Sequence, residues 1–169
     1  FIGMDMNVDY MSAVIACVYT DGTIHYYDEI RQSNSNTEAM SREMRKRWGL
    51  HPIFPDPAGK ARSTTSNRSD HQILKDNGFQ VIARVAHPTQ KDRLSALNRM
   101  LLDAKDRVKM TIDPSCIYLI KDLEQVQRDK KGGIDKSNPE LSHMLDACSY
   151  YIEYKHPIVQ RVGTSISWN

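Results

Sequence analysis

The segment Phe1-Ile2-Gly3-Met4-Asp5-Met6-Asn7 opens the chain as a short apolar run that ends at a carboxylate. Two segments rich in β-branched and aromatic residues follow at 11–20 and 23–30, on either side of Asp21-Gly22. Asp-Gly between such segments predicts a β-hairpin with a type I′ turn, because that turn needs positive φ at both central residues. We therefore expect residues 1–31 to form three consecutive antiparallel strands on which the rest of the sheet assembles.

Asp5 is an acid within an otherwise apolar predicted strand. A buried carboxylate is costly unless it has a partner, a proton or a metal ion. Two interpretations follow: Asp5 caps a turn at the strand end, which this stretch alone favours, or Asp5 is a ligand in a site. The remaining sequence is needed to choose between them.

Size and composition narrow the class of protein. A chain of 169 residues corresponds to one domain and can bury a substantial core. The formal net charge of +2 permits a nucleic-acid partner without requiring one. Cys17, Cys116 and Cys148 have no C-x-x-C spacing and are expected to be reduced. No apolar run approaches the length of a membrane span. Because the sequence begins with Phe1 inside a strand, we expect a fragment of a longer polypeptide.

The rest of the chain alternates predicted helices and strands. The expected order is a helix at 36–48, a strand at 52–54 leading to Asp56, a helix at 70–77, a strand at 79–85, a helix at 89–103, a strand at 108–112, a helix at 115–126, a charged hairpin at 128–136 and a helix at 140–154. Asn36, Thr89 and Ser115 are suitable N-caps. We expect one domain at 1–156 and a C-terminal tail at 157–169.

This order predicts an α/β fold with one mixed central sheet. Its first three strands would be antiparallel, the later strands parallel to the first, and helices would cover both faces. A right-handed crossover would place strand 52–54 beside the first strand, so Asp5 and Asp56 would emerge at the same edge. The last helix could bring Asp146 to that edge. Three convergent carboxylates predict a site for a divalent metal ion, and hard oxygen ligands select Mg²⁺ or Mn²⁺.

Residues 59–70 are small, polar and cationic. A phosphate-binding P-loop is excluded, because Ala61 stands where Ser or Thr is required and Phe54 where glycine is required. The cations of this loop could contact a DNA backbone beside Asp56, and an exposed loop with incidental charge is about equally compatible. With the lysines of the charged hairpin, the predicted DNA-binding set is Lys60, Arg62, Arg68, Lys130 and Lys131.

Three motifs together resemble those of ribonuclease H-like nucleases. They are Gly3-Met4-Asp5, Phe54-Pro55-Asp56-Pro57-Ala58-Gly59 and His143-Met144-Leu145-Asp146-Ala147-Cys148-Ser149-Tyr150. Each motif is weak alone, but their order, spacing and predicted secondary structure are jointly specific. More closely, the chain resembles the C-terminal nuclease domain of the large terminase subunit of tailed bacteriophages, as far as about His156.

The resemblance implies a metal-dependent endonuclease that cuts double-stranded DNA concatemers during headful-type viral genome packaging. It carries metal-binding and catalytic roles to Asp5, Asp56 and Asp146. Asp5 would bridge two Mg²⁺ or Mn²⁺ ions, ~4 Å apart, that activate water and stabilise the leaving oxygen. It also implies an upstream ATPase motor domain in the same polypeptide, with the portal protein and the small terminase subunit as partners, at the procapsid portal in the host bacterial cytoplasm.

Two further residues are candidates for auxiliary roles. His143 precedes Asp146 by one helical turn, so it could orient water or phosphate, although a structural histidine is at least as compatible. Asp9 is a weaker candidate for an additional acid. The other histidines before it, at 25, 51, 71 and 87, lack metal-ligand spacing.

Two alternatives remain open from the sequence. The first is another nuclease of the same fold, such as a Holliday-junction resolvase or a ribonuclease H, which substrate preference would distinguish. The second is a non-catalytic module that binds DNA or the portal, with acids that serve structure only, which metal titration would distinguish.

Overall fold

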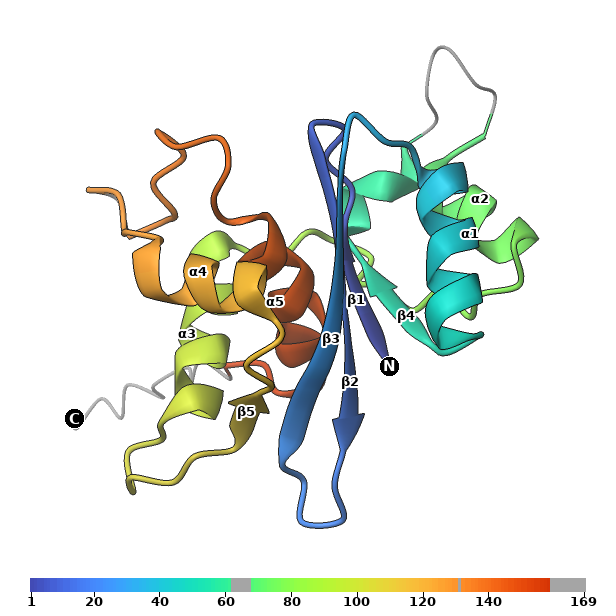
Figure 1. Cartoon of the computed structure of the whole chain (residues 1–169). Helices are drawn as coiled ribbons and strands as arrows, with labels where there is room; N and C mark the ends of the chain where they lie inside the picture. Colours follow the sequence, from blue (N-terminus) through green and yellow to red (C-terminus); the bar gives the residue numbers. More distant parts are fainter. Residues whose placement is uncertain (62–67, 131, 159–169) are drawn as a thin grey trace, which may run out of the picture.

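The computed structural model describes residues 1–61, 68–130 and 132–158. Its first three strands are β1 (Ile2–Asp5), β2 (Tyr10–Val18) and β3 (Ile24–Ser33), paired antiparallel in sequence order. The predicted opening meander is therefore confirmed (Figure 1).

The β2–β3 hairpin forms, but the predicted type I′ turn is wrong. Only Gly22 has positive φ, at 83°, while Asp21 is not among the positive-φ residues. The Gly22 N–H donates to the Tyr19 carbonyl, and the Asp21 carboxylate accepts from the Thr23 N–H at 2.8 Å. These bonds define a longer loop, a type I turn followed by a left-handed glycine, which is the next commonest hairpin connection.

Two parallel strands complete the sheet. β4 (Ile53–Pro55) pairs with β1, and β5 (Met110–Ile112) pairs with β3, giving the order β4-β1-β2-β3-β5. The mixed sheet with later strands parallel to the first is therefore confirmed.

The predicted strand at 79–85 is reduced to a single parallel bridge between Ile53 and Val81. In a parallel pair alternate residues of a strand bond to the same neighbour, so Ile53 and Pro55 face this side. The Ile53 N–H donates to the Gln80 carbonyl and its carbonyl accepts from the Ile82 N–H. Pro55 has no N–H to continue the ladder, so pairing ends after one residue.

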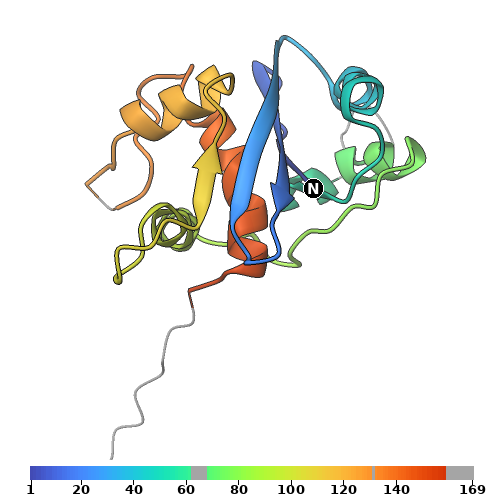
Figure 2. The same cartoon turned by 60° about the horizontal axis from the view of Figure 1, so that its bottom comes forward.

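Helices cover both faces of the sheet (Figures 1 and 2). On one face lie α1 (Thr37–Trp48) and α2 (Asp70–Asp76). On the other lie α3 (Gln90–Leu101), α4 (Ile117–Gln125) and α5 (His143–Lys155). The predicted caps Asn36 and Thr89 accept from the backbone N–H groups of Ala39 and Asp92. A 3₁₀ turn, η1 (Pro57–Lys60), follows β4.

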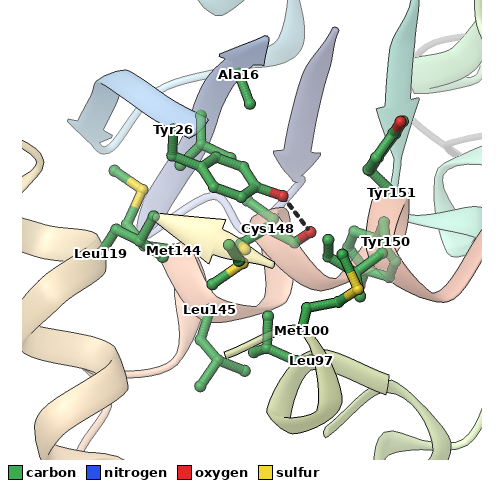
Figure 3. Close-up of a cluster of buried hydrophobic side chains, with 14 of the residues drawn as sticks. Ala16, Tyr26, Leu97, Met100, Leu119, Met144, Leu145, Cys148, Tyr150 and Tyr151 are labelled. Atoms are coloured by element: carbon green, nitrogen blue, oxygen red, sulfur yellow. Dashed lines mark hydrogen bonds between the residues drawn. The ribbon is translucent and has the colours of Figure 1, made fainter. Parts of the chain in front are cut away.

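Each face of the sheet has its own hydrophobic core. The larger core packs β2 and β3 against α3, α4 and α5 (Figure 3). At its centre the Tyr26 hydroxyl donates to the Cys148 carbonyl of α5 at 3.2 Å. The smaller core lies under α1 and α2 and contains Ile2, Met4, Met11, Ala13, Ile15, Ile30, Met40, Met44, Ile53, Leu74 and Phe79. Since β1 sends Ile2 and Met4 to this smaller core, its alternate residues Gly3 and Asp5 face α5.

Two predicted helix starts are corrected. α4 begins at Ile117 without the expected Ser115 cap, since the Ser115 hydroxyl donates instead to Asp113. α5 begins at His143, three residues after the expected Glu140, because Ser142 is left-handed at φ 80°.

The charged hairpin at 128–136 forms one antiparallel bridge, between Arg128 and Ile134. Cys17, Cys116 and Cys148 are free, as expected. Within the described ranges, no helix has the length and apolarity to cross a membrane. The tail at 157–169 falls almost wholly outside those ranges, so the boundary at 156 stays a prediction.

Candidate active site

Asp5 and Asp56 lie at the same edge of the sheet. Met4 pairs with Pro55 in the parallel β1–β4 ladder, and the Asp56 N–H donates to the Met4 carbonyl at 3.0 Å. The two acids are therefore the residues that leave adjacent strands at their carboxyl ends, as the crossover rule predicts. The Asp56 side chain also accepts from the Ala58 N–H at 2.8 Å, which caps η1.

Gly3 allows α5 to approach this edge. A Cβ atom at Gly3 would lie 2.2 Å from the Ala147 carbonyl oxygen of α5, so only glycine permits this contact. Asp5 lies two residues further along the same face of β1, and Asp146 lies in the first turn of α5. The close packing therefore brings these two carboxylates together from segments far apart in sequence.

Two buried carboxylates fix the residues at which α4 and α5 begin. Glu29 of β3 accepts from the N–H groups of Tyr118 and Leu119 at 2.8 and 2.9 Å, at the start of α4. Asp122 of α4 then accepts from the N–H groups of Met144 and Leu145 at 2.9 and 3.2 Å, at the start of α5. Because helix N-termini carry free donors and partial positive charge, each carboxylate anchors the next helix.

Asp5 lies close enough to Asp146 and Asp56 for the charges of those two carboxylates to act on it. Burial raises the pKa of Asp5 above its usual value, the hydrogen bond from His143 opposes this rise, and the carboxylates of Asp146 and Asp56 add to it. Asp5 and Asp146 are 7% and 5% exposed, so the cluster is deeper than an open surface groove. A cavity of about 250 Å³ adjoins the cluster at His143 and Lys136, which line it together with Asn7, Asp9, Asn138, Pro139 and Leu141.

Each acid is paired with a basic side chain. Asp5 Oδ2 lies 3.0 Å from His143 Nδ1, and Asp56 Oδ1 lies 3.1 Å from His87 Nε2. Asp146 has two partners: Arg93 Nη1 lies 2.8 Å from Oδ1, and Lys136 Nζ lies 2.8 Å from Oδ2. Asp146 is therefore balanced by two cations of the chain, while Asp5 and Asp56 each face a histidine ring.

The donor chemistry fits a hard divalent cation, since three carboxylates supply oxygen ligands from three elements. In the described part of the chain, however, no group of three or more His, Cys, Asp or Glu residues is already arranged to hold a metal ion. The carboxylates would have to exchange their basic partners for the metal. The three side chains are thus suitable ligands for a divalent metal ion, but they must rearrange to bind one.

His143 is a direct neighbour of the acid cluster. Its Nε2–H donates to the Pro139 carbonyl at 2.9 Å, while Nδ1 lies within hydrogen-bond distance of Asp5 Oδ2, at 3.0 Å. Burial opposes the charge on His143, but the Asp5 carboxylate and the Pro139 carbonyl, which accept hydrogen bonds from the charged ring, raise its pKa overall. The side chain thus fixes the position of the Asp5 carboxylate. Asp9 lies exposed in the β1–β2 turn, on the rim of the adjoining cavity.

The predicted DNA-binding cations are dispersed. Lys60 at the end of η1 donates to the carbonyls of Arg84 and Val85, and Arg68 forms an ion pair with Asp76 of α2. Lys130 is exposed on the charged hairpin. Arg62 and Lys131 fall outside the described residues. The DNA-binding role of the set stays a prediction.

Sequence reasoning missed Arg93, Lys136 and His87. His87 could have been found from the sequence. The segment at 79–85 was predicted as a strand, it runs parallel to β4, and residues that follow it reach the same edge as Asp56. Arg93 and Lys136 could not have been found in this way, since the sequence placed them only on a helix and in a charged hairpin. Arg93 is buried: its guanidinium also donates to Ser149 Oγ at 2.6 Å and lies 4.7 Å from the Tyr150 ring centroid.

Replacing Asp5 by Asn should leave the metal-free domain as stable as the wild type, or more stable. Asn keeps a hydrogen bond to His143 and removes a charge whose burial is unfavourable. Because the folded-state pKa of Asp5 is raised, wild-type stability falls as pH rises from 3.8 through that pKa. The advantage of the variant should therefore grow as pH rises over this range. Urea denaturation at pH 4 to 8 measures it, and unfolding of the variant at neutral pH would show that the Asp5 charge is structural.

Solved structures of known proteins share the fold of this chain. Structural similarity extends to the P22 large terminase nuclease domain, with TM-score 0.66, 18% identity and coverage of 93% of this chain and 81% of that one. It extends to the large terminase nuclease domain of bacteriophage SPP1 with bound Mn, with TM-score 0.61, 20% identity and coverage of 91% and 85%. For the large terminase of a thermophilic bacteriophage, in complex with ATP-gamma-S, the TM-score is 0.63 at 13% identity, with coverage of 90% and 38%.

These likenesses establish the ribonuclease H-like fold. No curated protein sequence matches significantly. The family described as the terminase RNaseH-like domain matches residues 2–155, nearly the whole chain. The chain therefore belongs to the terminase RNaseH-like domain family.

Proposed function

We propose that this domain is the metal-dependent endonuclease of a phage large terminase, which cuts double-stranded DNA concatemers during genome packaging. The observation that carries the proposal is the meeting of Asp5, Asp56 and Asp146 at one edge of the sheet, within a terminase family fold. Similarity to terminase nuclease domains, one of them with bound Mn, supports the nuclease role.

Asp5, Asp56 and Asp146 would hold two Mg²⁺ or Mn²⁺ ions. The bound ions would supply an activated water and stabilise the leaving oxygen of the phosphodiester. The chain's own residues supply the frame: Gly3 and Asp122 place α5, and His143 orients Asp5. Burial of the cluster limits access of bulk water and strengthens each electrostatic contact.

DNA would be held through phosphate contacts from Lys60, Arg62, Arg68, Lys130 and Lys131 without base readout. An ATPase motor domain would precede this domain in the polypeptide. The large terminase of the thermophilic bacteriophage, described in complex with ATP-gamma-S, is matched over only 38% of its length and leaves room for one. The portal protein and small terminase subunit would be further partners, at the procapsid portal in the host bacterial cytoplasm.

A plasmid assay tests the function. The domain should nick or linearise supercoiled DNA slowly, with little sequence preference, when Mn²⁺ or Mg²⁺ is present, and EDTA should abolish the activity. Binding should weaken steeply with salt, because phosphate contacts release counterions. Preference for four-way junctions, or for RNA, would favour another nuclease of the same fold.

Mn²⁺ should raise the melting temperature of the domain by about 5 to 10 °C at 100-fold excess over its Kd, by mass action on the folded state. Differential scanning fluorimetry with and without Mn²⁺ measures this shift. Asp146→Asn should reduce it, because a ligand is lost. Asp106→Asn is the matched control: Asp106 is exposed at φ 55°, a conformation that Asn tolerates, and the full shift should remain. An equal shift in all three proteins would place the metal elsewhere.

A further inference from the structure

Both carboxylate oxygens of Asp146 are already bonded to cations of the chain. Oδ1 accepts from Arg93 Nη1 at 2.8 Å and Oδ2 accepts from Lys136 Nζ at 2.8 Å. A Mg²⁺ ion would need a carboxylate oxygen at ~2.1 Å, where a neighbouring ammonium or guanidinium repels it. If Asp146 is a metal ligand, one of these cations must leave when the metal binds.

Arg93 is the cation that stays. Its side chain is 3% exposed, it also donates to Ser149 Oγ, and its guanidinium lies against the Tyr150 ring. Its Nε is, within the described ranges, the one buried side-chain nitrogen or oxygen without a hydrogen-bond partner. Breaking this pair would leave a buried charge uncompensated, which is strongly unfavourable.

Lys136 is the cation that can leave. Its side chain is 48% exposed, and its other bond is to Ser142 Oγ at 2.6 Å. It lines the 250 Å³ cavity beside the acids, so the ammonium can turn into water along a flexible stem. Since partly exposed ion pairs contribute little net free energy, its release costs far less than the release of Arg93.

We propose that Lys136 is a displaceable internal cation that competes with the divalent ion for Asp146. The proposal rests on the proposed function, because it takes Asp146 as a metal ligand. Lys136 occupies Asp146 Oδ2 until metal binds. The apparent metal affinity is then the intrinsic affinity multiplied by the fraction of molecules in which this oxygen is free. Removal of the ammonium should therefore tighten Mn²⁺ binding about five- to tenfold.

Calorimetric titration of the metal-free domain with Mn²⁺ alone, without DNA, tests this. Lys136→Met keeps the stem and removes the charge, so its Kd should fall about five- to tenfold. Lys136→Arg keeps a cation beside Asp146 and should retain wild-type affinity. Lys91→Met, at an exposed position in the first turn of α3, is the matched control for loss of one positive charge and should stay within about twofold of wild type.

An unchanged or weaker Mn²⁺ affinity in Lys136→Met, with normal binding by the wild type, would overturn the role of Lys136 and leave the metal site intact. Absence of Mn²⁺ binding by the wild type, or binding that Asp146→Asn does not weaken, would instead overturn the metal site and this inference with it. Should Lys136→Met fail to fold, Lys136→Gln makes the same comparison with a polar side chain that can still bond to Ser142.

Discussion

Alanine in place of Asp5, Asp56 or Asp146 is expected to reduce plasmid cleavage by more than about 100-fold. Loss of a residue that only hydrogen-bonds to a metal ligand typically lowers metal affinity or activity about 10–100-fold, and loss of the ligand itself should cost more. Each replacement removes a proposed ligand of the ions. DNA binding should not weaken, since the three acids would hold metal ions and their removal makes the site more positive. Gel-based cleavage assays and fluorescence anisotropy, at one salt concentration, separate the two effects.

The controls for this experiment follow from the contacts of each acid. Asp56 also caps η1 through the Ala58 N–H, so Asp56→Asn should be tested beside Asp56→Ala to retain the cap. Loss of Asp146 leaves the buried Arg93 unpaired, so Asp146→Asn is the gentler variant. Asp106→Asn, exposed after α3, should cleave like the wild type. Wild-type cleavage by all three alanine variants would show that the two-metal assignment is wrong, whatever the fold.

The sequence was sufficient to predict the first three strands and the place of β4, because a hairpin signal and the crossover rule determine them. The Asp21-Gly22 hairpin orders the first three strands, and the crossover rule then places Asp56 beside Asp5. Turn geometry and strand length were less predictable. The β2–β3 hairpin has a longer loop than the predicted two-residue turn. A proline in β4 prevents residues 79–85 from pairing beyond one bridge.

The surroundings of the acids could not be predicted, because their partners depend on packing between distant elements. Arg93 and Lys136 lie 53 and 10 residues from Asp146, and no helical or strand period relates them. The Glu29 and Asp122 carboxylates that fix α4 and α5 act across 90 and 23 residues. A sequence motif can therefore identify the acids while the cations that balance them appear only in the folded chain.

Gly3→Ala is the substitution expected to damage the site most without touching a charged residue. The new Cβ would lie 2.2 Å from the Ala147 carbonyl oxygen and 3.1 Å from its carbon, both backbone atoms that cannot rotate away. Overpacking of this kind costs about 3 kcal/mol, which corresponds to a fall of roughly 6 to 12 °C in Tm for a domain of this size.

The damage should extend to the chemistry, because the clash would push α5 away from β1 and carry Asp146 away from Asp5. A displacement of about 1 Å at a catalytic group can cost about 100-fold in rate. Circular dichroism melting and cleavage well below the lowered Tm measure the two effects separately. Gly22→Asn is the matched control: Gly22 has φ 83° with no atom within 4 Å of an added Cβ, and Asn tolerates that conformation. If Gly3→Ala melts and cleaves like the Gly22 control, α5 does not depend on close contact with β1, and another feature must hold Asp146 beside Asp5.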